Sequence, residues 1–84
     1  MSPTVIILEG YRFFFFSEEG NERPHIHVKK ENRLCKFWIS PKIKLAKNTR
    51  FKDFELKRIE AFVLENQKIL LRRWYEYFHT RRKI

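Results

Sequence analysis

Residues 24–30, P-H-I-H-V-K-K, decide how the first half of the chain folds. Pro24 disfavours helical backbone before it and suits the first position of a strand, so the stretch predicts a β-strand. Alternate side chains of a strand point to opposite faces. One face carries His25, His27 and Lys29, and the other carries Ile26 and Val28. The strand therefore predicts a sheet with one apolar face and one face equipped for binding or chemistry.

The segment that follows predicts the other half of a β-hairpin. Residues 31–33, E-N-R, are short enough for a turn, and residues 34–40, L-C-K-F-W-I-S, form the return strand. Pairing of the two strands puts Cys35, Phe37 and Ile39 on the apolar face. Lys36 and Trp38 then lie on the same face as the histidines. If a strand over residues 11–17 is a neighbour in the same orientation, the histidine face also gains Arg12, Phe14 and Phe16.

The remaining strands flank this hairpin. Residues 4–9 are rich in β-branched side chains, and Gly10 offers a turn into residues 11–17, Y-R-F-F-F-F-S. The four phenylalanines alternate between faces, so this strand is either covered on both faces or carries aromatic rings at a binding surface. Residues 42–47 form a short final strand or an extended crossing. We therefore expect a four- or five-stranded, mainly antiparallel sheet.

The C-terminal half predicts a long helix over residues 52–79, with Asn48 and Thr49 as its caps. Its apolar side chains fill an arc of roughly 200°, wider than the ~100° stripe of a helix on one sheet. Either the helix breaks near Asn66 and its two halves fold on one another, or a partner chain covers the excess. The sequence thus predicts one α+β domain over residues 1–84, with a sheet (1–47), a helical part (48–79) and a basic tail (80–84).

Charge is the main compositional signal. The net charge is +9: residues 1–40 carry six Lys/Arg against five Asp/Glu, and residues 41–84 carry thirteen against five. Such an excess favours polyanions or an acidic protein as partner, or simply a soluble surface. A lone cysteine, Cys35, excludes a disulfide framework. The sequence shows neither a secretion signal nor a run of ~20 apolar residues, so we expect a cytoplasmic protein without a membrane partner.

The histidine face suits RNA. Arg12, Lys29 and Lys36 can hold phosphates, and Trp38 can stack on a base. As a metal-independent ribonuclease, the protein would use His25 and His27 as acid and base, because imidazoles titrate near neutrality and these two lie roughly 7 Å apart on a strand. Further basic contacts are expected from Arg72, Arg73, Arg81 and Arg82. The alternative is a non-catalytic nucleic-acid- or protein-binding module in which the histidines are structural.

Two other functions are compatible with the sequence: a metal site at the histidines and a protein-interaction surface on the C-terminal helix. A metal site would combine His25 and His27 with a carboxylate from Glu18, Glu19 or Glu22, but there is no second His/Asp pair at fixed spacing. We therefore expect no metal and no cofactor. A protein-interaction surface would use the aromatic end of the helix, either for an acidic partner or for a homodimer. The aromatic residues there are Trp74, Tyr75, Tyr77 and Phe78.

Four segments together resemble the small bacterial proteins of domain-of-unknown-function family 4160. They are G-Y-R-F-F-F-F-S (10–17), E-G-N-E-R-P-H-I-H-V (19–28), K-F-W-I-S-P (36–41) and E-N-Q-K-I-L-L-R-R-W-Y-E-Y-F (65–78). The matching positions are Pro24 to Val28, Phe37, Trp38, Pro41, Asn66 and Trp74. The resemblance implies a toxin-like component of a toxin–antitoxin pair, held in check by a small antitoxin-like partner that we expect to be acidic. The chain departs from the family pattern in its many Arg and Lys residues near the end.

Overall fold

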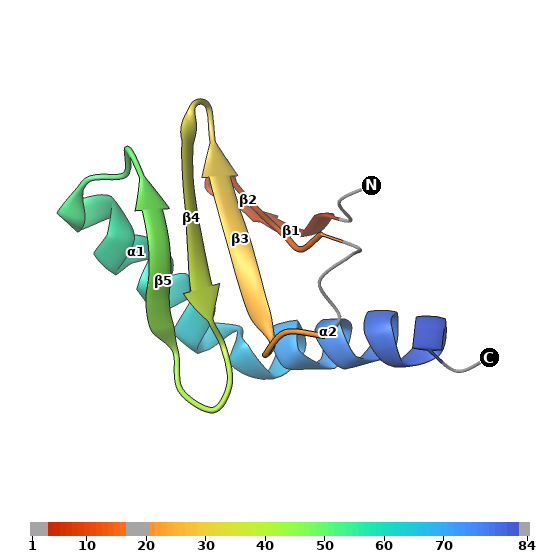
Figure 1. Cartoon of the computed structure of the whole chain (residues 1–84). Coiled ribbons are helices and arrows are strands. Elements are labelled where there is room, and N and C mark those ends of the chain that lie inside the picture. Colours follow the sequence, from red (N-terminus) through yellow and green to blue (C-terminus); the bar gives the residue numbers. More distant parts are fainter. Residues whose placement is uncertain (1–3, 17–20, 83–84) are drawn as a thin grey trace.

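The computed structural model describes residues 4–16 and 21–82 and has α+β architecture, as predicted (Figure 1). The elements in chain order are β1 (Thr4–Leu8), β2 (Tyr11–Phe14), β3 (His25–Lys30), β4 (Arg33–Trp38), β5 (Lys44–Thr49), α1 (Asp53–Glu65) and α2 (Gln67–Arg82). The five strands form one antiparallel sheet in the order of the sequence. Each strand therefore pairs with the strand next to it in the chain. The last segment, for which the sequence allowed either a strand or an extended crossing, forms the strand β5.

Tight turns set the order of the strands. Glu9 and Gly10 join β1 to β2, and both have positive φ (51° and 84°). Positive φ at both central residues is the conformation of the two-residue turn whose twist suits a hairpin, and Gly10 adopts it without steric cost. β3 and β4 are joined by Glu31 and Asn32, with Glu31 also at positive φ (56°). The hairpin predicted from residues 24–40 is confirmed.

The register confirms the predicted assignment of side chains to faces. His25 lies opposite Trp38, and His27 lies opposite Lys36. On the other face, Ile26 pairs with Phe37 and Val28 with Cys35. β2 adds to both faces, because Arg12 pairs with Lys29, Phe13 with Val28 and Phe14 with His27. β2 is thus the neighbour of β3, as the prediction required, and Arg12 and Phe14 lie on the histidine face.

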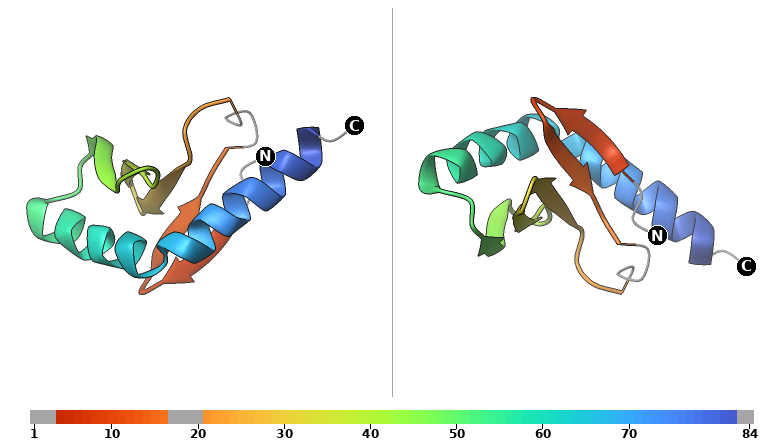
Figure 2. Two further views of the ribbon diagram at one scale, coloured as in Figure 1. Left: turned by 90° about the horizontal axis from the view of Figure 1, so that it is seen from below. Right: turned by 90° about the horizontal axis from the view of Figure 1, so that it is seen from above.

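The apolar face of the sheet carries the core, and the helices cover it. Figure 2 shows the two helices following one another along one side of the sheet as a bent rod. The buried core combines sheet residues with one stripe from each helix. Its buried members include Tyr11, Phe13, Phe15, Ile26, Val28, Phe37, Ile39, Phe51, Ile59, Val63, Leu70, Trp74 and Phe78. Burial of this apolar surface supplies most of the free energy of folding.

The predicted helix breaks at Asn66. Asn66 ends α1, and its side-chain Nδ2 donates to the Phe62 carbonyl over 2.7 Å. The two halves do not fold on one another, which corrects that prediction; they meet at their ends and both pack on the sheet (Figure 2). α1 buries Ile59 and Val63, and α2 buries Leu70, Trp74 and Phe78. The apolar arc of the sequence is wider than this buried stripe because Leu64 (63%) and Ile69 (50%) are exposed.

Two boundaries differ from prediction. Asn48 and Thr49 do not cap the helix: they end β5, and α1 begins after Lys52. Asn48 instead holds the turn before α1, because its Nδ2 donates to the Phe51 carbonyl (2.9 Å) and its Oδ1 accepts from the Phe51 N–H (3.2 Å). At the other end, α2 runs to Arg82, so the residues expected to begin a separate tail at 80 continue the helix. Neither helix in the described part of the chain combines the length and apolar character needed to cross a bilayer.

Candidate functional site on the open sheet face

Apart from His25, which packs beside Trp74 of α2, the second face of the sheet lies outside the helix-packed core, and the charged side chains that its strands contribute are all basic. The open face, as we call it, is formed by Arg12, Phe14, His27, Lys29, Leu34, Lys36, Trp38, Lys44, Lys47 and Thr49. None of the five strands contains Asp or Glu, although together they carry seven Lys or Arg. Five of those seven cations lie on the open face. The acidic residues that the structure describes in the N-terminal half, Glu9, Glu22 and Glu31, lie outside the strands, so the near-neutral charge of residues 1–40 conceals a basic sheet.

A β-bulge contributes to this charge. Lys36 pairs with Lys47, but the next residue, Phe37, pairs with Leu45, so Ala46 is an extra residue in β5. In a regular strand, side chains three positions apart point to opposite faces, and the bulge reverses that relation. Lys44 therefore joins Lys47 on the open face, opposite Trp38 and Lys36 respectively. The bulge aligns two more cations with the histidine strand.

An aromatic cluster surrounds His27. The ring centroids of His27 and Phe14 lie 5.5 Å apart in a stacked arrangement, and those of His27 and Phe16 lie 4.7 Å apart edge to face. Arg12 places its guanidinium 4.8 Å from the centre of the Phe14 ring. His27 is 8% exposed and Phe16 is 37% exposed. The cluster holds His27 in one orientation while leaving part of Phe16 at the surface.

A hollow of about 220 Å³ opens beside this cluster. It is lined by Phe16, His27, Leu34, Cys35, Lys36, Lys47 and Thr49. Its size is below the roughly 300 to 1,000 Å³ of typical small-molecule pockets. An aromatic ring, an imidazole, a hydroxyl and two ammonium groups therefore meet in a space suited to a fragment such as one base or one phosphate.

His25 has a different environment from His27. Its side chain has no exposed surface, and its Nδ1 donates to the Arg23 carbonyl over 2.8 Å. The Trp74 ring of α2 lies 4.9 Å away and the Trp38 ring 5.6 Å away, centroid to centroid. A general acid or base must touch its substrate. Although the two imidazoles lie only 5.1 Å apart, only His27 borders the hollow; His25 is part of the packing between the sheet and α2.

Trp38 is half-buried and already carries two cations on its ring. The guanidinium of Arg23 lies 4.3 Å from its centre and the Lys36 ammonium lies 4.4 Å from it. Lys36 also donates to Glu22 Oε1 over 3.0 Å. A base could stack on Trp38 only by displacing one of these cations. Phe16, rather than Trp38, is the aromatic ring that the structure presents at the hollow.

The other predicted nucleic-acid contacts divide by position. Arg12 and Lys29 pair with each other across β2 and β3 on the open face, as expected. Arg72 and Arg73 are exposed on α2, and neither lines the hollow. Arg81 and Arg82 lie in the last turn of α2. The structure thus brings together the basic residues of the strands and leaves Arg72 and Arg73 outside that cluster.

Several residues of this site were not predicted from the sequence. Lys44, Lys47 and Thr49 come from β5, and Arg23 comes from the loop before β3. The spacing K-x-x-K in a strand places two lysines on opposite faces, so no local signal could reveal their common face. A sheet-wide count of acidic residues per strand would have revealed the basic surface.

Metal ligation finds no support in the described ranges. Across 4–16 and 21–82, no group of three or more His, Cys, Asp or Glu side chains is arranged to hold a metal ion. Glu18 and Glu19, named above as carboxylate ligands, fall outside these ranges. Glu22 lies beside Lys36 and 4.0 Å from Nδ1 of His25. Cys35 lines the hollow but is buried, and burial raises the pKa of its thiol to about 12, so it is a poor metal ligand or nucleophile near neutral pH.

Comparison with known protein families agrees with the resemblance drawn from the motifs. The family model described as domain of unknown function DUF4160 matches residues 10–75. The chain belongs to the DUF4160 family. The matched region of this DUF4160 protein extends from the turn before β2 to the middle of α2, and so includes the whole open face. No curated protein and no solved structure matches the chain.

Proposed function

We propose that this DUF4160 protein binds single-stranded RNA through the open face of its sheet. The observation that carries the proposal is the hollow in which Phe16, His27 and Thr49 meet Lys36 and Lys47. Single strands are commonly bound by a basic groove for the backbone together with aromatic rings for the bases. The open face combines both features on one surface.

Each group has a defined role in this proposal. Phe16 stacks on one base, and Lys47 and Lys36 hold the adjoining phosphates. Arg12 and Lys29 extend the phosphate path across β2 and β3. The Thr49 hydroxyl, at the rim of the hollow, offers a hydrogen-bond partner to a ribose 2′-hydroxyl, the group that distinguishes RNA from DNA.

We propose binding without cleavage. The two-histidine mechanism requires both imidazoles at one phosphate, and His25 is enclosed by Trp38, Trp74 and the Arg23 carbonyl. This geometry favours the reading in which His25 is structural and His27 shapes the hollow. Toxin action, control by an acidic partner, a homodimer through α2 and cytoplasmic location stay predictions.

Fluorescence anisotropy with a labelled oligouridine of about ten nucleotides tests the proposal. We expect Phe16→Ala to weaken binding by about 5- to 160-fold, equivalent to roughly 1–3 kcal/mol for one stacked base. Lys47→Ala is expected to reduce the slope of log affinity against log salt by about 0.7, the value for one phosphate contact on a single strand. Incubation of the same oligonucleotide with wild type should leave it intact.

Lys57→Ala serves as the matched control for Lys47→Ala. Lys57 is an exposed lysine of α1, on the side of the molecule away from the hollow, and its loss changes the net charge by the same amount. If both lysine variants bind RNA equally, the contact is a diffuse charge effect and the assignment to the hollow is wrong. Wild-type affinity in Phe16→Ala contradicts the stacking role.

A further inference from the structure

β5 forms one edge of the sheet and is the least covered element. It pairs with β4 alone, and all six of its residues are exposed. An edge strand presents backbone N–H and C=O groups that have no ladder partner on the outer side. Such an edge can accept an extended segment of another protein as an additional strand.

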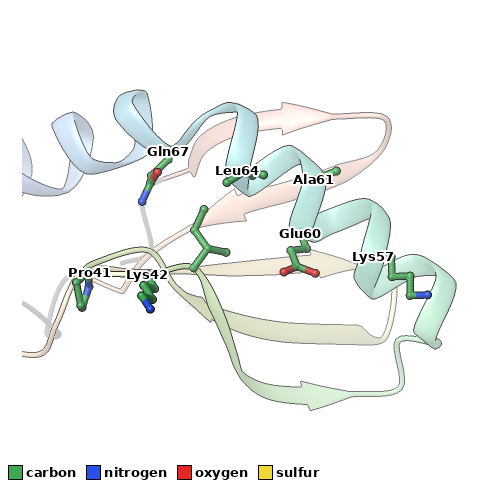
Figure 3. A pocket seen from close by; sticks show the side chains of 8 residues that line it. Pro41, Lys42, Lys57, Glu60, Ala61, Leu64 and Gln67 are labelled. Carbon is green, nitrogen blue, oxygen red and sulfur yellow. The ribbon is translucent and has the colours of Figure 1, made fainter.

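A groove runs alongside this edge, between α1 and the strand. It consists of a hollow of about 510 Å³ at the loop before β5, which Figure 3 shows, and a second of about 240 Å³ beside β5. Both are lined by Lys57 and Glu60. The apolar lining comes from Phe37, Ile43, Leu45, Leu56, Ala61 and Leu64. Leu64 is 63% exposed, so the helix side of the groove lacks a covering element in the described chain.

The two faces of β5 indicate which side chains an added strand would need on each of its own faces. Leu45 pairs with Phe37 and faces the groove, whereas Lys44 and Lys47 lie on the open face. A strand added next to β5 continues this alternation. Every second side chain enters the groove and must be apolar, and the side chains between them lie beside Lys44 and Lys47. Carboxylates at those positions form favourable cross-strand pairs.

The charges of β5 also disfavour a second copy of this chain as occupant. β5 carries two lysines and no acidic residue, so pairing two copies through β5 brings like charges together. Lysines on an edge strand oppose pairing with a like strand for the same reason. An acidic strand turns this repulsion into attraction.

We propose that the β5 edge and the groove beside α1 bind an extended segment of a partner protein in which acidic and apolar residues alternate. The segment extends the sheet by one strand, places apolar side chains against Leu45 and Leu64, and places carboxylates beside Lys44 and Lys47. The proposal shares Lys47 with the hollow but does not require RNA binding there, because the edge of β5 and the apolar groove carry it.

A synthetic peptide of about eight residues, with alternating Glu and Val and blocked ends, serves as the probe. Its binding is followed by the amide signals of ¹⁵N-labelled full-length protein and by calorimetry. We expect saturable shifts in β5 and in the groove side of α1. A peptide with Lys in place of Glu is expected to bind at least about tenfold more weakly, because it reverses two cross-strand charge pairs.

Two variants with matched controls separate the contacts. Lys44→Glu and Leu64→Glu are each expected to weaken binding of the acidic peptide by about tenfold or more. Lys68→Glu and Ile69→Glu make the same substitutions at exposed positions of α2 and should bind within about twofold of wild type. All four side chains are exposed, so the fold should survive.

Three outcomes would overturn the proposal. The first is no binding of the acidic peptide to wild type, and the second is equal binding of the Lys peptide. The third is self-association of wild type through β5, seen by sedimentation, which would assign the edge to a second copy. RNA binding is tested separately with the variant Phe16→Ala, because Phe16 lines the hollow and not the groove. Either proposal can therefore fail while the other holds.

Discussion

Replacing His25 by alanine should destabilise the protein strongly, and this separates a structural histidine from a catalytic one. The side chain has no exposed surface and contacts the rings of His27, Trp38 and Trp74. Its removal leaves a cavity at the contact between β3 and α2 and deprives the Arg23 carbonyl of its donor. Large-to-alanine changes in a core cost about 2–5 kcal/mol, so we expect a loss of about 3 kcal/mol.

Thermal unfolding followed by circular dichroism measures this loss. For a domain of this size, each 1 kcal/mol lowers Tm by about 4–8 °C, so His25→Ala should lower it by about 12–24 °C. His25→Phe keeps an aromatic ring but loses the Nδ1 donor, so its Tm should lie between those of wild type and His25→Ala. Lys29→Ala, two strand positions away from His27 on the same face and exposed, should change the free energy of unfolding by less than about 0.5 kcal/mol.

A Tm of His25→Ala within about 4 °C of wild type, which corresponds to less than 1 kcal/mol, would contradict a structural role of His25. That result would mean that α2 does not hold His25 in the core in solution. The imidazole would then be available to a ligand, and the two-histidine mechanism would regain its geometric basis.

Two further predictions concern stability. Burial raises the pKa of the Cys35 thiol to about 12; the unfolded chain therefore binds fewer protons above pH ~9, and the free energy of unfolding should fall between pH ~9 and ~12 by up to about 4 kcal/mol. Urea titrations across this range should show a shallower fall in Cys35→Ala, and an equal fall in both proteins would contradict the assignment. Asn48→Ala removes both hydrogen bonds to Phe51 and should cost about 1–2 kcal/mol in the same assay; an unchanged urea midpoint would show that the turn before α1 does not depend on them.

The alternation of residues 24–40 was enough to predict the hairpin and both of its faces. His27 and Lys36 share a face because side chains in strands repeat every two residues, and that rule needs no knowledge of distant contacts. The helix break at Asn66 was also predictable, since an amide side chain inside an apolar arc is costly unless it caps a helix.

The burial of His25 could not be predicted from the same rule. It depends on the direction in which α2 leaves Asn66, because that direction brings Trp74 against the start of β3. The contribution of Lys44 and Lys47 to the open face depends on one extra residue, Ala46, in β5. Both features arise from long-range packing and strand register, which local periodicity does not encode.

The most direct test of the central claim is a titration of ¹⁵N-labelled protein with a single-stranded RNA of about ten nucleotides, followed by amide chemical shifts. Binding at the hollow predicts saturable changes at Phe16, His27, Lys36, Lys47 and Thr49, with α1 little affected. Changes confined to α2 around Arg72 and Arg73, or no change in the sheet at saturating RNA, would contradict the claim that the open face is the RNA-binding surface.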